Sequence, residues 1–256
     1  MIDLRDVWED RARRMGSTLG GVLFKGFTPQ ANSMLHEWHV RLVREILAPH
    51  ISDESVVVDL GCGYGRLSGI LASHRPDLFI VGQDISSSYC HNFSEGGLAV
   101  VQANLAQLPF RSSSLGGALA VTSLMYVNRE QAQEVLLGIH DLLESGAPLL
   151  LIDPGEELRA LIGRFGGCRV ASSTGGRGFR RLEYQQLAQA AGFELICAGG
   201  NPRDSLIFAL SFGGRIGWQL ARRLIRRDGI SGGYSMLALH RWMLLKKSVA
   251  TLRGAT

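Results

Sequence analysis

The sequence feature that most constrains this chain is a short apolar run that ends in an acid and a glycine-rich turn. Val56, Val57 and Val58 precede Asp59, and glycines then recur at every second position in the segment V-V-V-D-L-G-C-G-Y-G-R. A buried parallel strand has this bounded apolar pattern, and closely spaced glycines let the backbone turn sharply beside a ligand. The segment therefore predicts a ligand site at the carboxyl end of a strand, beside the first turn of the next helix.

The rest of the chain alternates between strand and helix patterns, as right-handed βαβ units do. Strands are expected over 55–60, 78–82, 98–101, 117–122, 148–152, 193–198 and 235–247, and helices over 32–49, 66–73, 87–95, 129–144 and 183–191, with Asn128 capping the fourth of these helices. These elements predict an α/β fold with a doubly wound parallel sheet. No internal repeat is visible.

Composition supports one globular α/β domain. The chain has 256 residues, of which 46% are hydrophobic and 20% charged, a balance typical of a protein with a sizeable core. The four cysteines form no C-x-x-C pair, so we expect no metal site and reduced thiols in a cytoplasmic protein. Residues 1–14 are too charged for a signal peptide, and no apolar run approaches the length of a membrane span.

Three regions are expected: a helical cap over 1–49, a catalytic domain over 50–204 and 235–250, and a helical insert or lid over 205–234. The stretch 205–227 combines apolar residues with five arginines. It could cover the substrate pocket or a dimer partner, or lie on an anionic bilayer. The lid is favoured, because three glycines interrupt the helix. The glycine-rich and arginine-rich segment 155–181 is expected to be a functional loop.

The register of the glycines narrows the class of cofactor that this loop could bind. A dinucleotide fingerprint has a third glycine where this chain has Arg66. Asp59 would repel a pyrophosphate but attract a ligand that carries an ammonium and a sulfonium. Asp84 ends the second predicted strand, where a carboxylate can accept hydrogen bonds from ribose hydroxyls. These residues favour an adenosyl cofactor over a nicotinamide cofactor.

The sequence resembles the class I S-adenosylmethionine-dependent methyltransferases, in the small-molecule branch that includes the quinone-biosynthesis enzymes. The matching segments span roughly residues 50–200, and they read V-V-V-D-L-G-C-G-Y-G-R, V-G-Q-D-I-S, A-N-L-A-Q-L-P-F, G-A-L-A-V-T-S-L-M-Y-V, L-L-E-S-G-A-P-L-L-L-I-D-P-G and R-L-E-Y-Q-Q-L-A-Q-A-A-G-F. The resemblance implies a seven-stranded, mostly parallel Rossmann-like sheet with an antiparallel last strand. It also implies S-adenosyl-L-methionine as the cofactor.

The same resemblance implies which residues bind that cofactor. The glycine loop approaches the methionine moiety, and Asp59 holds its ammonium directly or through water. Asp84 binds the ribose and Ile85 packs on the adenine. The family usually has Asp at the position of Asn104, whose amide oxygen can still accept from the adenine amine in a weaker contact. The full set is Asp59, Gly61, Cys62, Gly63, Gly65, Asp84, Ile85, Asn104, Leu105 and Ser123.

The catalytic residue is harder to assign, because methyl transfer needs mainly alignment of donor and acceptor and the exclusion of water. A base is needed only when attack must accompany the loss of a proton. Four side chains are candidates for that role. The first two are His36 and His39, for which the favoured interpretation is a pair of partly exposed helix histidines. The third is Tyr126, which stands where many relatives have histidine and could instead pack beneath the cofactor. The fourth is Asp153, at a predicted strand end, which could equally cap the following helix.

The favoured function is O-methylation of a small molecule. The alternatives are N- or C-methylation of a small or lipid-like substrate, a nicotinamide-dependent oxidoreductase, and a non-catalytic cofactor-binding protein. No nucleic acid substrate is expected, since the chain lacks the Asn/Asp-Pro-Pro-aromatic motif after the fourth strand and the Pro-Cys pair of base-methylating enzymes. A homodimer and a peripheral membrane contact through 205–227 are left open.

Overall fold

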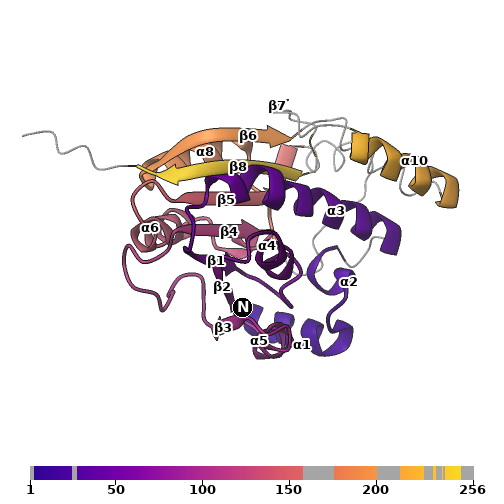
Figure 1. The fold of residues 1–256 in the computed structure, drawn as a ribbon, viewed down its shortest axis with the longest axis horizontal. Helices are drawn as coiled ribbons and strands as arrows, with labels where there is room; N and C mark the ends of the chain where they lie inside the picture. Colours follow the sequence, from indigo (N-terminus) through magenta and orange to yellow (C-terminus); the bar gives the residue numbers. More distant parts are fainter. Residues whose placement is uncertain are drawn as a thin grey trace, which may run out of the picture.

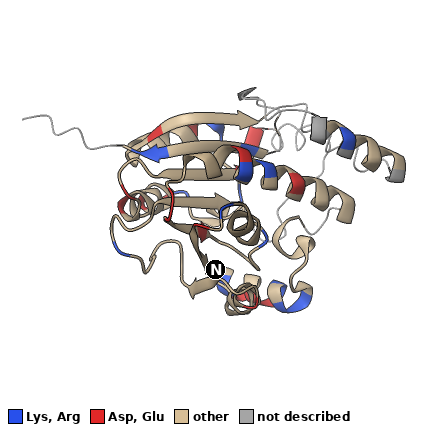
Figure 2. Ribbon diagram, in the orientation of Figure 1, with Lys and Arg blue, Asp and Glu red and all other residues tan. Residues whose placement is uncertain are grey.

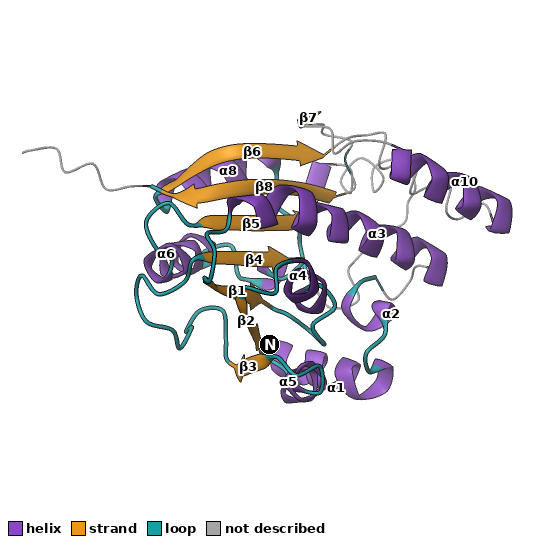
Figure 3. Cartoon of the chain, in the orientation of Figure 1, coloured by secondary structure: helices purple, strands orange, loops and turns teal. Residues whose placement is uncertain are grey.

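A computed structural model describes residues 3–24, 28–157, 176–200, 214–227, 233–234, 238 and 240–248. One mixed sheet runs through the molecule with helices on both faces (Figure 1, Figure 3). Its strands are β1 Val56–Leu60, β2 Phe79–Asp84, β3 Ala99–Gln102, β4 Gly117–Val121, β5 Pro148–Pro154, β6 Phe193–Gly200, β7 Gly233–Tyr234 and β8 His240–Lys247. Their spatial order is β3-β2-β1-β4-β5-β8-β6-β7.

The predicted Rossmann-like topology is confirmed. Strands β1 to β5 are parallel, and β8 runs antiparallel to both β5 and β6. Seven strands correspond to those expected, and the described residues add the two-residue β7 at the edge, parallel to β6. After β3, at one edge of the sheet, the chain returns to the middle and continues with β4 on the other side of β1. The order of the strands therefore reverses between the neighbouring strands β1 and β4. Ligands of doubly wound sheets bind at such a reversal, at the carboxyl ends of the strands.

Helices cover both faces of this sheet. They are α1 Leu4–Met15, α2 Leu19–Val22, α3 Pro29–Arg41, α4 Ser68–His74, α5 Ser87–Ser94, α6 Ala132–Leu142, α8 Arg181–Ala190 and α10 Gly214–Arg227, with short turns η1 Leu42–Leu47, η2 Ala48–His50 and η3 Leu124–Tyr126. The predicted cap at Asn128 is wrong, because α6 begins three residues later than expected, with Gln131 at its N-cap. Most of the predicted functional loop at 155–181 lies outside the described residues.

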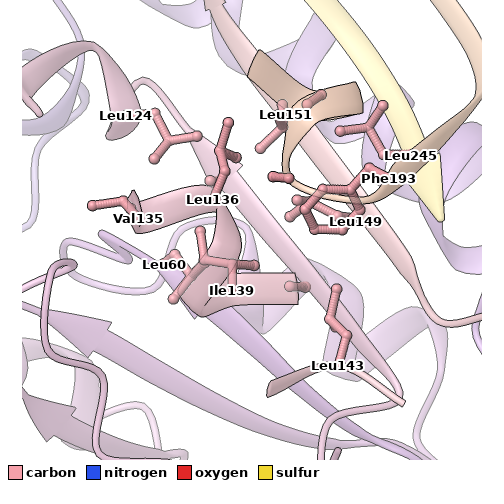
Figure 4. Close-up of a cluster of buried hydrophobic side chains, with 14 of the residues drawn as sticks. Leu60, Leu124, Val135, Leu136, Ile139, Leu143, Leu149, Leu151, Phe193 and Leu245 are labelled. Carbon is pink, nitrogen blue, oxygen red and sulfur yellow. The ribbon is translucent and has the colours of Figure 1, made fainter. Parts of the chain in front are cut away.

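The central strands β1, β4 and β5 are buried on both faces, which explains their continuous apolar sequence. Successive side chains of a strand point to opposite faces. Val58, Leu149 and Leu151 thus join a cluster with α6 and α8, part of which appears in Figure 4. Val57 and Leu150 join a second cluster with α3, η1 and α4. A parallel sheet covered in this way is held rigidly, so it presents the loops at its carboxyl edge in fixed positions.

Helix α10, from the predicted insert, lies beside α3 (Figure 1). Ala221 is fully buried in the second cluster, the one that includes α3, and Trp218 and Leu224 pack against that cluster. On the opposite side Ile216 is 83% exposed and Leu220 is 47% exposed. Basic residues colour part of this helix blue in Figure 2. Within the described ranges, every helix is too short or too polar to cross a bilayer.

We predict that Leu119→Ala lowers the free energy of unfolding by about 3 kcal/mol, because it leaves a cavity in the middle of β4. Leu119 is fully buried between β1 and β5. Leu137→Ala on α6, where the side chain is 45% exposed, is the matched control and should cost less than about 1 kcal/mol. Urea denaturation measures both, and equal losses would contradict the assignment of the core.

Candidate functional site

The glycine loop between β1 and α4 has the geometry that only glycine tolerates at its tightest points. Gly61 and Gly65 have φ angles of 73° and 83°. A Cβ on Gly61 would lie 2.5 Å from the Cβ of Ser123, and one on Gly65 would lie 2.8 Å from the Phe93 ring. The loop is therefore pressed between the turn after β4 and helix α5. This close packing is what the spacing of the glycines indicated.

Asp84, at the end of β2, ties this loop in place. Its Oδ2 accepts a hydrogen bond of 2.8 Å from the Gly63 amide, and its Oδ1 accepts one of 2.9 Å from the Ser86 amide. Burial raises the pKa of this carboxyl, although both amide donors oppose the rise. The Ile85 amide opposes the rise as well. A carboxylate has about four acceptor positions in all, so it can still accept a hydrogen bond from a ribose hydroxyl.

Asp59 is a buried carboxyl at the end of β1. Its Oδ2 accepts a hydrogen bond of 2.5 Å from the Ser68 hydroxyl at the start of α4. Burial raises its pKa to about 6, although Ser68 and the positive charge of Arg66 oppose the rise. Among the described residues no cation lies within the 4.0 Å of an ion pair with it. A ligand ammonium placed here would supply the missing counter-charge.

The remaining predicted cofactor residues surround the same edge of the sheet. Ser123 follows β4, and its buried hydroxyl has no hydrogen-bond partner among the described residues. Ile85 is half-buried beside Asp84. Asn104 is exposed, and its Oδ1 accepts from the Ala106 amide at 3.0 Å, so its own turn takes one of the lone pairs expected to face the adenine amine. The predicted set thus meets at the carboxyl ends of β1, β2 and β4, while Asn104 and Leu105 follow β3.

Helix α1 adds contacts that the sequence did not indicate. Glu9 accepts hydrogen bonds from Ser86 at 2.8 Å and from the Ser88 amide at 3.2 Å, at the start of α5. Desolvation raises the pKa of Glu9, but these hydrogen bonds outweigh it and lower the pKa to about 2. Trp8 meets Tyr126 edge to face, with ring centroids 5.1 Å apart. Helix α1 therefore bridges the ends of β2 and β4.

The histidines of α3 contact the glycine loop through Arg66. Its guanidinium donates to Nδ1 of His36 at 3.2 Å and to Nδ1 of His39 at 3.0 Å. His39 also lies 3.3 Å from Nδ1 of His240, at the start of β8. The interpretation of His39 as a partly exposed helix histidine is wrong, because the residue is fully buried. No sequence signal linked Arg66 or His240 to these residues.

Asp153 and Tyr126 lie at the neighbouring strand ends. Asp153 is buried at the end of β5 and accepts a 2.6 Å hydrogen bond from the Tyr184 hydroxyl of α8. Burial raises its pKa to about 7 in spite of that bond. Tyr126 is half-buried in η3, in contact with Trp8. The structure therefore brings the four catalytic candidates to one edge of the sheet, without joining them into one cluster.

Comparison with known proteins shows that part of this chain is similar to methyltransferases. Residues 57–146 match a family model described as a methyltransferase domain. The chain is 25% identical over 163 residues to O-methyltransferase cnsE of Penicillium expansum, covering 59% of this chain and 58% of that protein. It is 26% identical over 114 residues to the tRNA (carboxymethyluridine(34)-5-O)-methyltransferase of Arabidopsis thaliana, covering 38% of this chain and 27% of that protein. The chain thus spans less than two thirds of the length of either relative.

A solved structure shows the same fold. The geranyl diphosphate C-methyltransferase of Streptomyces coelicolor A3(2), in complex with Mg²⁺, geranyl diphosphate and S-adenosyl-L-homocysteine, superposes with a TM-score of 0.64. It is 14% identical, with 96% of this chain and 97% of that chain covered. Residues 57–146 are thus similar to a methyltransferase domain, the chain has the fold of S-adenosylmethionine-dependent methyltransferases, and the cofactor that this similarity indicates is S-adenosyl-L-methionine.

The residues present fit that cofactor. Asp59 is a buried carboxyl without a cation within ion-pair distance in the described chain, and Ser123 presents a buried hydroxyl without a partner there. Asp84 places a buried carboxylate next to the loop. Buried polar groups normally have partners, so these groups are suited to a polar, cationic ligand.

We predict that the affinity for S-adenosyl-L-homocysteine, the demethylated product, falls about tenfold per pH unit once the pH drops below about 6. The raised pKa leaves Asp59 neutral below that value, so it no longer attracts the ligand ammonium, whereas above it the carboxylate is charged. Calorimetric titration of the wild-type protein over this range measures the effect.

Asp59→Asn is the matched variant for this measurement, because it keeps the shape of the side chain and removes its charge. It should bind weakly throughout and show a flatter pH profile. A wild-type affinity that does not change across pH 6, or an Asp59→Asn variant with the wild-type profile, would disprove the ammonium contact.

Proposed function

We propose that this protein transfers the methyl group of S-adenosyl-L-methionine to an oxygen atom of a small molecule. The observation that carries the proposal is the uncompensated Asp59 carboxyl beside the glycine loop, which suits a donor with an ammonium group. The choice of oxygen is supported by the two curated relatives described above, both of which are named as methyltransferases that act on oxygen. The predicted membership of a quinone-biosynthesis branch stays a prediction, as does N- or C-methylation.

When bound, the cofactor supplies a methyl group that its sulfonium already activates. The protein then has to orient donor and acceptor and to exclude water. Asp59 and Asp84 would hold the two ends of the donor, at fixed places on adjacent strands. Helix α1 would close the site, because Glu9 fastens it to α5 and Trp8 packs on Tyr126.

The contacts rank the four candidate bases. His36 and His39 each accept a hydrogen bond from Arg66 through Nδ1, so the lone pair that a base needs is already engaged. Asp153 accepts from Tyr184 inside the core. Tyr126 lies in the turn after β4, beneath Trp8 of the closing helix. From its place in the turn at the carboxyl end of β4, we propose Tyr126 as the side chain that contacts the acceptor.

We predict that Tyr126→Phe lowers kcat by about 10- to 100-fold while the affinity for S-adenosyl-L-homocysteine changes less than about threefold, if its hydroxyl acts on the acceptor. The same ring would still pack against Trp8, so the fold should be retained. Steady-state kinetics and calorimetry measure the two quantities. An unchanged kcat would show that Tyr126 acts by packing alone.

The proposed function is tested by transfer of a labelled methyl group from S-adenosyl-L-methionine to four acceptor classes: phenols, carboxylic acids, amines and tRNA. We predict labelled product from one of the oxygen acceptors, and none in the Asp59→Asn variant. Mass spectrometry and NMR of the product would place the methyl group on oxygen. Transfer to tRNA would overturn the proposed small-molecule substrate, and transfer to amines alone would overturn O-methylation.

For residues 205–227, the predicted lid, dimer contact and membrane contact also stay proposals. Part of that stretch, residues 205–213, lies outside the described residues. Helix α10 uses Trp218, Ala221 and Leu224 to pack on the molecule, which supports a cover over α3. Its exposed Ile216 and Leu220 are compatible with a dimer or a membrane contact. Co-sedimentation with anionic vesicles and measurement of the molar mass in solution would separate these proposals.

A further inference from the structure

Arg66 lies directly after the glycine loop and makes an uncommon pair of contacts. Its two terminal nitrogens donate to Nδ1 of His36 and Nδ1 of His39, at 3.2 and 3.0 Å. A guanidinium can only donate hydrogen bonds, so both Nδ1 atoms must be acceptors. Both imidazoles are therefore neutral, with their proton on Nε2.

The protonation state of His240 follows from these two contacts. Nε2 of His39 carries the proton, so across the 3.3 Å contact it donates to Nδ1 of His240. His240 must then carry its own proton on Nε2 as well. Burial, with the positive charge of Arg66, lowers the pKa of His36 and of His240 to about 4, which agrees with neutral rings.

The three histidines consequently leave the charge of Arg66 uncompensated. Burial lowers the pKa of Arg66 only to about 10, with Asp59 opposing the shift, so the guanidinium is charged near neutral pH. None of the described carboxylates lies within the 4.0 Å of an ion pair with it. The two histidine contacts use two of its five N–H groups. A partly buried cation with N–H groups to spare is suited to an anion that can accept two parallel hydrogen bonds.

The position of Arg66 indicates which anion. Asp59 and Arg66 flank the same loop and sense each other's charge, since each shifts the pKa of the other. An α-amino acid carries its ammonium and its carboxylate on one carbon atom. The groups that bind them must therefore be neighbours, one acidic and one basic. Asp59 and Arg66 form such a pair at the end of the loop expected to face the methionine moiety.

We propose that Arg66, oriented by His36 and His39, forms a carboxylate-binding subsite beside Asp59, and that it holds the α-carboxylate of the methyl donor. This inference rests on the methyl donor of the proposed function. It also gives the histidines of α3 a role: they are positioning residues that fix the plane of the guanidinium. A lysine has one nitrogen and cannot contact both imidazoles and a carboxylate in this fork.

The experiment compares two ligands that differ in the amino-acid group. S-Adenosyl-L-homocysteine carries the carboxylate and the ammonium, whereas 5′-methylthioadenosine has the same adenosine and sulfur but lacks both. Calorimetry would titrate each ligand into the wild-type protein, Arg66→Met, Arg66→Lys and the control Arg44→Met. Arg44 is exposed on η1 and belongs to the same helical segment as the histidines.

The expected result is that Arg66→Met weakens S-adenosyl-L-homocysteine by about 10- to 100-fold and 5′-methylthioadenosine by less than about threefold. Arg66→Lys should fall between the wild-type protein and Arg66→Met, and Arg44→Met should bind both ligands as the wild-type protein does. Retained binding of 5′-methylthioadenosine also shows that the variant is folded.

Three outcomes would overturn the subsite. Equal weakening of both ligands by Arg66→Met would make Arg66 a structural residue. In a further titration, benzoate is added as a carboxylate acceptor analogue to the complex of the protein with S-adenosyl-L-homocysteine. If Arg66→Met leaves the affinity for S-adenosyl-L-homocysteine unchanged but abolishes benzoate binding, Arg66 binds the carboxylate of the acceptor and not that of the donor. A wild-type protein that binds neither adenosyl ligand would refute the methyl donor itself, and the proposed function would fall with the subsite.

Discussion

The candidate site depends on one side chain that joins two strands, the carboxylate of Asp84. It accepts from the Gly63 amide of the loop after β1 and from the Ser86 amide at the start of α5. Glu9 of α1 then accepts from the Ser86 hydroxyl, which extends the connection to the first helix. The glycine loop, α5 and α1 are thus held to one another by consecutive hydrogen bonds. A substitution of Asp84 would therefore affect the positions of the glycine loop, α5 and α1.

The charges at this edge are arranged so that a zwitterionic ligand completes them. Burial disfavours the ionised forms of both Asp59 and Arg66, and the pair lies too far apart for an ion pair within the described residues. A buried charge without a partner lowers stability, so each group stores unfavourable electrostatic energy until a ligand compensates it. Binding a ligand with opposite charges in matching order relieves both. With the proposed subsite, this compensation would let a site with few polar contacts select its donor.

The sequence predicted the sheet well because its signals are local. Apolar runs such as 148–152 are buried on both faces, and the alternation with helices indicates a parallel α/β sheet. The loop and Asp84 were predicted for the same reason. The cap at Asn128 was wrong, because the chain makes a turn before α6 begins. The contacts of His39 with Arg66 and with His240 were beyond prediction, because they join residues up to 201 positions apart and depend on packing.

Arg66 also limits what the α3 side of the site can do chemically. Because it donates to His36 and His39, these rings present N–H groups instead of free lone pairs, and the same polarity passes on to His240. A proton leaving the acceptor therefore cannot be taken up by these histidines while Arg66 keeps its place. An acceptor that is already acidic, such as a phenol or a carboxylic acid, needs no such base. For the proposed O-methylation, an acidic oxygen acceptor is thus the kind that needs no base from α3.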